Sequence, residues 1–315
     1  MFEWIYAIIW AFISSYLVMR LYNGLWVIVR LIYLWYIRPK LDLSPYKNLW
    51  TVVTGGTDGI GKAYTIELAR RGMRKFMLIG RNPSKLKNVA DILKRDHKCE
   101  VETYVFDFAN DDLKQLPKQL TEYEIGILVN CAGVAVEKIE RLTEHEEGLA
   151  SSILQVNLMS TVKMIELVMP GMVARDRGIV VNVASITGWR PLPYMSAYPA
   201  SKAGVTFFSQ ALYEEYAKTN VKVQCLVPIL VATKLASYDG KDADGYVVIS
   251  PETYAKDAVD VIGYRNCTGS KAHEVQIALL ALFSFWLFKV LFVPLVLLTL
   301  HKNRMTTKPA EKKVE

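Results

Sequence analysis

The stretch Thr54-Gly55-Gly56-Thr57-Asp58-Gly59-Ile60-Gly61 decides the fold, because its place in the chain indicates a strand that turns directly into a helix. It follows a β-branched run at residues 50–54 and leads into a helical stretch at 61–71. Glycines in such a turn let the backbone approach a phosphate closely, and the helix N-terminus adds free N–H groups and a positive dipole end. The glycine order differs from GxGxxG, so the strand–turn–helix context carries the prediction of a phosphate-binding turn.

Outward from this turn, short apolar runs alternate with longer helical stretches. Such runs are typical of strands in a parallel sheet that helices cover on both faces. The runs lie at 50–54, 76–80, 101–106, 125–130, 178–184 and 221–227, and the helical stretches include 61–71, 84–97, 148–174 and 200–218. The pattern predicts an α/β fold with one catalytic domain, a doubly wound parallel sheet of the Rossmann type with six strands.

The end of the second strand indicates which dinucleotide the turn would bind. A carboxylate at this place, about 20 residues after the turn, binds the ribose 2′-hydroxyl of NAD. This chain has Gly80-Arg81 instead, and a guanidinium pairs with the 2′-phosphate that a carboxylate would repel. We therefore predict NADP(H), with a solvated surface arginine as the alternative interpretation. Asp107, which closes the third strand, is predicted to meet the edge of the adenine ring.

The first 40 residues are typical of a membrane anchor. The apolar run 2–19 meets the minimum of about 18 residues for a spanning helix, a second run at 21–37 follows, and Trp and Tyr are interleaved. The acidic Glu3 and the lack of a small-residue cleavage site disfavour a secretory signal, which leaves a buried core helix as the alternative. The basic flank at Arg38 and Lys40, together with the cytosolic supply of NADPH, places the body on the cytosolic side.

A second apolar run, 277–300, is interrupted by Lys289 and Pro294. Its unbroken pieces are too short to cross about 30 Å of hydrocarbon, so we expect an interfacial or re-entrant segment rather than a single span. The final Lys312-Lys313-Val314-Glu315 resembles the dilysine signal that returns membrane proteins to the endoplasmic reticulum. These features divide the chain into a membrane anchor (1–40), a catalytic domain (41–274), a membrane-associated segment (275–300) and a basic cytosolic tail (301–315).

The charge distribution supports membrane association over nucleic-acid binding. The net charge is +7, and residues 1–40 and 301–315 contribute +3 each, which leaves +1 on the body. A nearly neutral body carries no basic stripe for nucleic acid, whereas basic ends beside apolar runs suit a membrane surface. The four cysteines and four histidines have no metal-ligand or disulfide spacing, so we expect no metal site.

Several short motifs follow the glycine turn in a fixed order. They are Asn130-Cys131-Ala132-Gly133, Asn157, Ser185 and the pair Tyr198-x-x-x-Lys202. With the turn, they make residues 48–270 resemble the short-chain dehydrogenase/reductase family, and within it the subgroup of 17β-hydroxysteroid dehydrogenase type 3 and the very-long-chain 3-oxoacyl-CoA reductases. Cys131 departs from the Asn that braces the sheet in this family, which puts local stability in doubt more than catalysis.

The chemistry of the Tyr198–Lys202 pair can be argued from the residues. Spaced four apart, they share one face of a helix. A tyrosine titrates near ~10, so acid–base work near neutral pH needs a shift of roughly 3 units, or about 4 kcal/mol. A neighbouring ammonium stabilises phenolate and shifts the pKa in the required direction. Ser185 would donate a hydrogen bond to the substrate carbonyl, and the resemblance implies that Asn157 holds a water that relays protons to Lys202.

The resemblance also implies which residues form the site. The predicted catalytic residues are Asn157, Ser185, Tyr198 and Lys202. The predicted cofactor-binding residues are Gly55, Thr57, Asp58, Gly59, Ile60, Gly61, Arg81, Asp107, Asn130, Ala132, Gly133, Tyr198, Lys202, Pro228, Val231 and Thr233. The predicted substrate-binding residues are Ser185, Tyr198, Trp189 and Tyr194, in apolar, aromatic loops that suit a steroid and an acyl chain equally.

Taken together, the sequence predicts an enzyme of the endoplasmic-reticulum membrane that reduces a ketone on a lipid with NADPH. A 3-oxoacyl-CoA and a 17-ketosteroid both fit as substrates. The alternative is a catalytically silent family member that serves as a lipid- or cofactor-binding scaffold. The sequence leaves the oligomeric state open, with a homodimer as one candidate.

Overall fold

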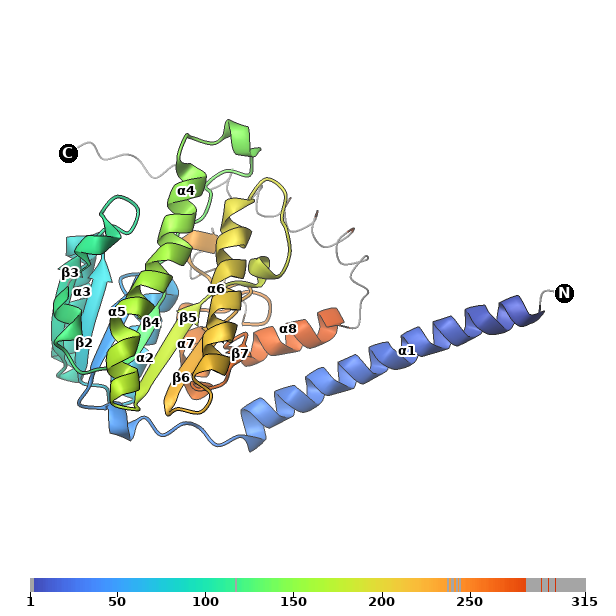
Figure 1. Ribbon diagram of the computed structural model, residues 1–315, viewed down its shortest axis with the longest axis horizontal. Helices are drawn as coiled ribbons and strands as arrows, with labels where there is room; N and C mark the ends of the chain where they lie inside the picture. The colour runs from blue at the N-terminus through green and yellow to red at the C-terminus, as the bar shows by residue number, and fades with distance from the viewer. Residues whose placement is uncertain are drawn as a thin grey trace.

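The computed structural model describes residues 3–281 apart from 117, 237, 239, 240, 242 and 244, together with the single residues 290, 294 and 298. Its centre is a parallel sheet in the order β3-β2-β1-β4-β5-β6-β7 (Figure 1). The strands are β1 Trp50–Thr54, β2 Lys75–Gly80, β3 Glu100–Val105, β4 Ile125–Asn130, β5 Gly178–Val183, β6 Val221–Leu226 and β7 Asn266–Cys267. The strand order reverses between β1 and β4, which confirms the predicted doubly wound sheet; the two-residue β7 was not among the predicted strands.

Helices cover both faces of the sheet and bury two apolar clusters against it. One face carries α2 Gly59–Arg70, α3 Pro83–His97 and α7 Pro251–Asp260, whose side chains Tyr64, Leu93 and Tyr254 join one cluster. The other carries α5 Ser160–Ala174 and α6 Ala197–Glu215, whose Met164 and Leu212 join the second. The central strands β1, β4 and β5 are buried along their whole length. Fully buried strands of this kind explain the continuous apolar runs in the sequence.

The helical stretch predicted at 148–174 is divided by a π-turn. It consists of α4 Leu149–Leu154, the π-helical η6 Gln155–Met159 and then α5. A π-turn holds one residue more than an α-turn, so it rotates the side chains that follow, and such turns are frequent at functional sites. Here the π-turn contains Asn157, a predicted catalytic residue, whose side chain is buried.

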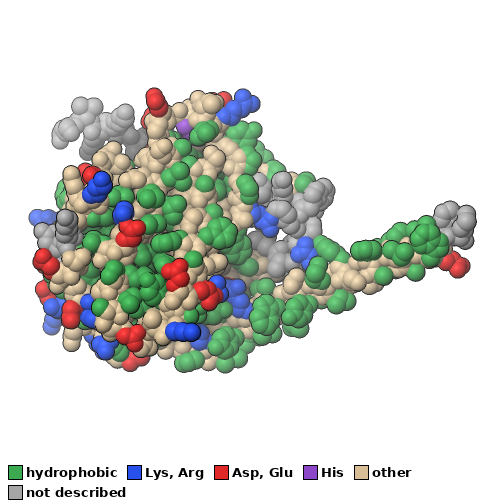
Figure 2. Space-filling model, viewed as in Figure 1, with side chains coloured by type: hydrophobic (Ala, Val, Ile, Leu, Met, Phe, Trp, Pro, Cys, Tyr) green, Lys and Arg blue, Asp and Glu red, His purple; other side chains and the backbone are tan. Residues whose placement is uncertain are grey.

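The N-terminal segment forms a helix that projects from the body. α1 Glu3–Ile32 continues into the π-helical η1 Tyr33–Ile37 and is covered with exposed apolar side chains (Figure 2). The helix is long and apolar enough to cross a membrane, with a mean hydropathy of 1.5, and none of its most apolar window is buried. The alternative of a buried core helix is therefore wrong, and α1 is a candidate membrane anchor. A second apolar stretch, Leu149–Ala174, is half-buried against the sheet, as expected for a core helix.

A helix late in the chain packs against α1. α8 Lys271–Ala281 packs beside α1, and Figure 1 shows the two helices running side by side. The predicted membrane-associated segment, 275–300, overlaps the end of α8, and most of it lies outside the described residues. The basic tail and its dilysine end also lie outside them.

Candidate active site

The glycine turn between β1 and α2 is packed tightly against the end of β4. Gly55 has φ +68°, and a Cβ on it would lie 2.8 Å from backbone atoms of Ala132 and Cys131. A Cβ on Gly61 would lie 2.3 Å from the Gly55 carbonyl oxygen. The Asp58 carboxylate accepts a hydrogen bond from the Gly59 N–H at 2.9 Å and caps the helix. Only glycine fits at positions 55 and 61, and the absence of side chains there leaves the backbone of the turn accessible to a pyrophosphate.

The ends of β1 and β4 are joined by a threonine that the sequence analysis did not select. The Thr54 hydroxyl oxygen accepts hydrogen bonds from the N–H groups of Cys131 and Ala132, at 3.2 and 3.3 Å. This contact fixes the Asn130–Gly133 segment against the glycine turn, and the signal for it in the sequence was a polar residue at the end of an apolar strand. A Cβ on Gly133 would lie 3.5 Å from Asn157 Oδ1 and 3.6 Å from Lys202 Nζ, so both predicted catalytic side chains flank this segment.

Asn157 connects three elements of the site. Its Oδ1 accepts from the Val134 N–H at 2.8 Å, and its Nδ2 donates to the Val134 carbonyl and to Ser201 Oγ at 2.9 and 3.0 Å. Ser201 in turn donates to the Tyr198 carbonyl at 2.7 Å. The buried amide thus ties the π-turn to the segment after β4 and to the first turns of α6, and the water relay implied for Asn157 stays a prediction.

Lys202 is the central cation of the site. Its side chain reaches the sheet from α6, where only 4% of the residue is exposed. Its Nζ donates to the Val183 carbonyl at 3.0 Å and lies 5.8 Å from the centroid of the Tyr198 ring. Burial lowers the pKa of Lys202 to about 8, and burial also raises the pKa of the neighbouring Cys131 thiol to about 11. The thiol is therefore uncharged at neutral pH and supplies no counter-charge for the ammonium.

Ser185 lies at the end of β5 and is buried. Its Oγ accepts from the N–H and the hydroxyl of Thr187, at 3.3 and 3.0 Å. Because these contacts use only its lone pairs, the Ser185 hydroxyl hydrogen remains available for a substrate carbonyl. The next residue is fixed by a hydrogen bond from the Ile186 N–H to the Pro228 carbonyl at 3.0 Å, which joins the loops after β5 and β6.

The predicted cofactor residues after β6 reach back toward the glycine turn. A Cβ on Gly59 would lie 3.0 Å from the Thr233 methyl carbon, which places Thr233 beside the start of α2. Val231 is buried and forms a parallel bridge with Ile249. These contacts bring the loop after β6 to the crevice at the switch point between β1 and β4, where open α/β sheets bind ligands.

Three further predicted cofactor residues differ in what their side chains contact. Arg81 is exposed directly after β2 and has no side-chain partner among the described residues, so its guanidinium is available to an anion. The Asp107 carboxylate instead accepts from the Ala109 N–H and the Asn110 side chain, within its own loop. The Asn130 side chain donates to Asn182 Oδ1 at 2.9 Å, across to the neighbouring strand β5, and its cofactor contact stays a prediction.

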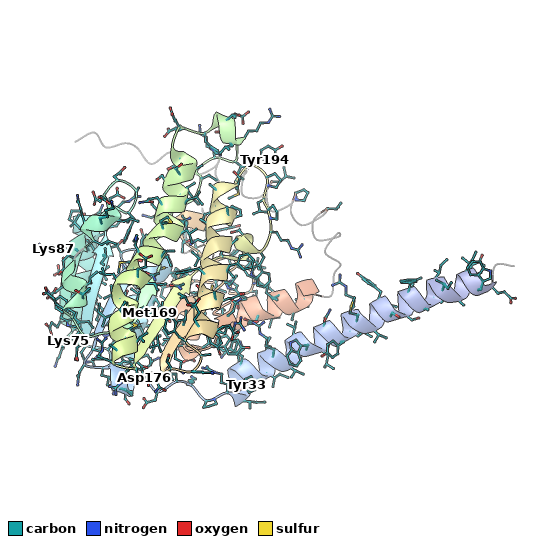
Figure 3. All side chains as sticks on the ribbon, in the orientation of Figure 1. Tyr33, Lys75, Lys87, Met169, Asp176 and Tyr194 are labelled. Atoms are coloured by element: carbon teal, nitrogen blue, oxygen red, sulfur yellow. The ribbon has the colours of Figure 1, made fainter. Side chains whose placement is uncertain are left out.

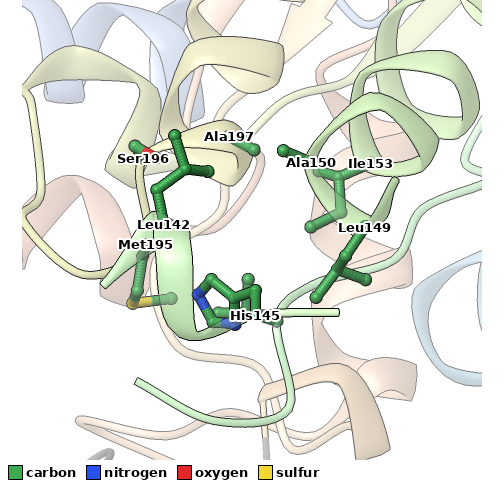
Figure 4. Close-up of a pocket in the computed structure, with 9 residues that line it drawn as sticks. Leu142, His145, Leu149, Ala150, Ile153, Met195, Ser196 and Ala197 are labelled. Carbon is green, nitrogen blue, oxygen red and sulfur yellow. The ribbon is translucent and has the colours of Figure 1, made fainter. Parts of the chain in front are cut away.

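The predicted substrate residues lie in two places. Tyr194 is half-exposed near the N-terminal end of α6, at the end of the domain where the strands finish (Figure 3). Trp189 contributes instead to a separate hollow on the outer face of α6, beside Phe207. Tyr198 packs against the buried side chains of Val136, Ile153 and Met195. These three side chains also line a small hollow, which the sequence analysis missed, between residues 142–153 and the start of α6 (Figure 4). Its lining is Val136, Leu142, His145, Leu149, Ala150, Ile153, Met195, Ser196 and Ala197.

Comparison with known proteins decides the family. Residues 49–244 match the short chain dehydrogenase family. The chain belongs to the short-chain dehydrogenase/reductase family. This confirms the resemblance that the glycine turn and the Ser185, Tyr198 and Lys202 positions suggested. A short-chain dehydrogenase from Sphingobium yanoikuyae, solved with NADPH, has 27% sequence identity and a TM-score of 0.61, over 67% of this chain and 83% of that one.

Relatives within the short-chain dehydrogenase/reductase family extend over most of the chain. The very-long-chain 3-oxoacyl-CoA reductase of Mus musculus is 37% identical over 278 residues, 87% of each protein. The inactive hydroxysteroid dehydrogenase-like protein 1 of Homo sapiens is 36% identical over 83% of this chain and 80% of that protein. An uncharacterized oxidoreductase of Caenorhabditis elegans, dhs-27, is 52% identical over 179 residues, which are 56% of this chain and 22% of that protein. The chain thus spans about a fifth of the length of the last relative.

Proposed function

We propose that this short-chain dehydrogenase/reductase uses NADPH to reduce a ketone on a lipid. The observation that carries the proposal is the buried Lys202 ammonium, placed beside the Tyr198 ring at the strand ends that also hold the glycine turn. A buried cation without a carboxylate partner among the described residues is unfavourable for folding. Its position next to a tyrosine suits a proton-transfer site.

NADP(H) fits the residues that would hold it. The glycine turn leaves room for the pyrophosphate, and the N-terminus of α2 faces that position with its N–H groups. The exposed Arg81 suits the 2′-phosphate that distinguishes NADP(H) from NAD(H). The structure of the Sphingobium yanoikuyae relative with NADPH supports the same cofactor.

Four side chains take part in the proposed reduction. When bound, NADPH would supply the hydride that the carbonyl carbon takes up. Tyr198 donates its phenolic proton to the carbonyl oxygen, and the Lys202 ammonium stabilises the phenolate that results. The Ser185 hydroxyl donates a hydrogen bond to the same oxygen and stabilises the charge that develops on it. Asn157 holds the backbone at Val134 and is proposed to position the water that restores the proton through Lys202.

A 3-oxoacyl-CoA is the substrate that we favour over a 17-ketosteroid. The mouse relative is named for very-long-chain 3-oxoacyl-CoA, and it aligns over 87% of both chains. The exposed side chains of Leu142 and Tyr194, near the N-terminal end of α6, offer apolar surface to a lipid chain. The substrate test measures NADPH oxidation by the purified protein with a 3-oxoacyl-CoA and, separately, with a 17-ketosteroid. A higher kcat/KM for the ketosteroid would overturn the preference.

A catalytically silent scaffold is the second candidate, favoured by the human relative that is named inactive. The complete Ser185, Tyr198 and Lys202 set in this chain argues against it. A scaffold of this kind would bind NADPH without oxidising it in the presence of either ketone. The same substrate test therefore separates the two candidates.

The cellular setting is also part of the proposal. We place the enzyme in the endoplasmic-reticulum membrane through α1, with the catalytic domain on the cytosolic side. Exposed apolar side chains along α1 support the membrane contact, and the basic Arg38 and Lys40 that follow it support the cytosolic side. Protease digestion of sealed microsomes should cleave the catalytic domain, whereas protection of the domain would refute this topology. The homodimer stays a prediction that light scattering in detergent would test.

A further inference from the structure

Three side chains at the start of α8 contact different parts of the molecule. His273 and Gln276, three residues apart, lie on one side of the helix and contact the segment after β6. Glu274 contacts α1. Helix α8 therefore lies between the candidate anchor and the loop after β6, which holds the predicted cofactor residues Val231 and Thr233.

His273 holds the beginning of this loop. It is fully buried, its Nδ1 accepts from the Ile229 N–H at 3.4 Å, and its Nε2 lies 3.1 Å from the Leu230 carbonyl oxygen. Only the neutral ring with its hydrogen on Nε2 satisfies both backbone groups. Burial lowers the pKa of His273 to about 4, so this form is present at neutral pH. The ring lies 5.9 Å from the Tyr254 ring, and Tyr254 donates to the Thr268 carbonyl just before α8.

Gln276 holds the end of the same loop. Its Nε2 donates to the Tyr246 carbonyl at 2.6 Å and to the Val247 carbonyl at 3.3 Å. The side chains of Tyr246 and Val247 are themselves largely exposed, at 82% and 54%. An amide bonded to the backbone therefore fixes a stretch whose own side chains bury little surface. Residues 229–230 and 246–247 are thus both bonded to α8.

Glu274 connects α8 to α1 through a partly buried ion pair, in which the Arg30 side chain is 34% exposed and the Glu274 side chain 2%. The whole Glu274 residue is 1% exposed, and its Oε1 accepts from the Thr268 N–H at 2.8 Å. Arg30 Nη2, from α1, lies 3.4 Å from both carboxylate oxygens and 3.3 Å from the Asn266 carbonyl oxygen. Charged groups within a long apolar helix are costly and are kept where they have a partner. Arg30 is thus bonded to the body of the enzyme.

We propose that α8 is a positioning element that couples the docking of α1 to the placement of the loop ends at 229–230 and 246–247. His273 and Gln276 hold the loop, and the Arg30–Glu274 pair holds α8 against the anchor. The effect of this coupling on activity rests on the proposed function, because Thr233 of this loop lies beside Gly59 of the predicted cofactor turn. The anchor then contributes to the geometry of the site as well as to its location.

The test compares two ion pairs between the anchor segment and the body that differ in exposure. Arg30→Met removes the partly buried pair with Glu274, whereas Lys40→Met removes an ion pair with Asp260 in which the lysine is 63% exposed. Limited trypsin digestion of the full chain in detergent, without cofactor or substrate, measures the rate of cleavage after Lys234, an 84% exposed residue of the loop. We expect Arg30→Met to raise this rate about fivefold to tenfold and Lys40→Met to leave it unchanged, since exposed pairs contribute little.

His273→Leu provides a second test that leaves the Arg30–Glu274 pair in place. We expect the same faster cleavage, and we expect the double variant to cleave no faster than the faster single variant, because both changes act through α8. In activity assays Arg30→Met should raise KM for NADPH and ketone more than it lowers kcat. Wild-type cleavage rates in Arg30→Met, or multiplicative effects in the double variant, would overturn the proposal. Because cleavage is measured without turnover, an inactive wild-type enzyme would refute the proposed function and leave the coupling testable.

Discussion

Replacing Lys202 by methionine should make the protein more stable while removing its activity. The pKa of Lys202 is lowered from 10.5 to about 8 by burial. Below pH 8 the folded and the unfolded chain both carry the proton, so the full cost of burying the charge is present there. A shift of about 2.5 units corresponds to roughly 3 kcal/mol of destabilisation at neutral pH. Between about pH 8 and 10.5 the unfolded chain binds more protons, so stability rises with pH.

Methionine keeps the length of the side chain and removes the charge. It also removes the hydrogen bond to the Val183 carbonyl, which costs about 1 kcal/mol. The net expectation for Lys202→Met is a gain of about 2 kcal/mol in the free energy of unfolding at pH 7. The gain should disappear by about pH 10, where the wild-type lysine is neutral in the folded protein.

Urea unfolding of the full chain in detergent, at pH 7 and pH 10, measures both effects. Lys87→Met, at an exposed position of α3, serves as the control for removal of a lysine charge and should change stability by less than about 0.5 kcal/mol. A Lys202→Met protein that is less stable than wild type at pH 7 would refute the reasoning. So would a stability difference that is the same at both pH values.

Three further substitutions test the cofactor site and the sheet beneath it. Gly55→Ala places a Cβ 2.8 Å from the Ala132 backbone at φ +68°, so we expect at least a tenfold weaker Kd for NADPH by fluorescence titration, and an unchanged Kd would contradict the turn assignment. Arg81→Ser should lower the preference for NADPH over NADH in kcat/KM by about 10- to 100-fold, as expected for loss of one charge-assisted hydrogen bond; an unchanged preference would remove Arg81 from the cofactor site. Asn182→Leu leaves the buried Asn130 amide without its acceptor, so urea unfolding should show a free energy of unfolding about 2 kcal/mol lower than that of the wild type. An unchanged free energy of unfolding would show that the Asn130–Asn182 hydrogen bond does not stabilise the sheet.

Much of the fold could be predicted because its strands are buried on both faces. The predicted strands at 50–54 and 125–130 have the observed bounds, since each is a fully buried apolar run. β7 forms only two backbone pairs with β6 and has no periodicity to detect. The π-turn around Asn157 depends on contacts with Val134 and Ser201 rather than on local sequence.

The candidate site was also predictable in part, because its residues follow a recognisable spacing. Ser185, Tyr198 and Lys202 were selected from spacing and resemblance, and the structure brings Lys202 and Tyr198 together. Side chains that act across long sequence distances gave no signal. His273, without metal-ligand spacing, contacts residues more than forty positions away. Arg30 and Glu274, 244 positions apart, become partners only when α1 and α8 pack together.

The central claim is that Tyr198 delivers the proton in a ketone reduction that uses NADPH. The most direct measurement is the rate of NADPH oxidation with a 3-oxoacyl-CoA by the wild type, Tyr198→Phe and Tyr213→Phe. Tyr213 lies on the same helix and its ring contacts Arg265, so it controls for the loss of a hydroxyl from α6. We expect Tyr198→Phe to lose about 10²–10⁴-fold in kcat/KM and Tyr213→Phe to stay within about twofold of the wild type. A Tyr198→Phe enzyme within tenfold of the wild type would contradict the account.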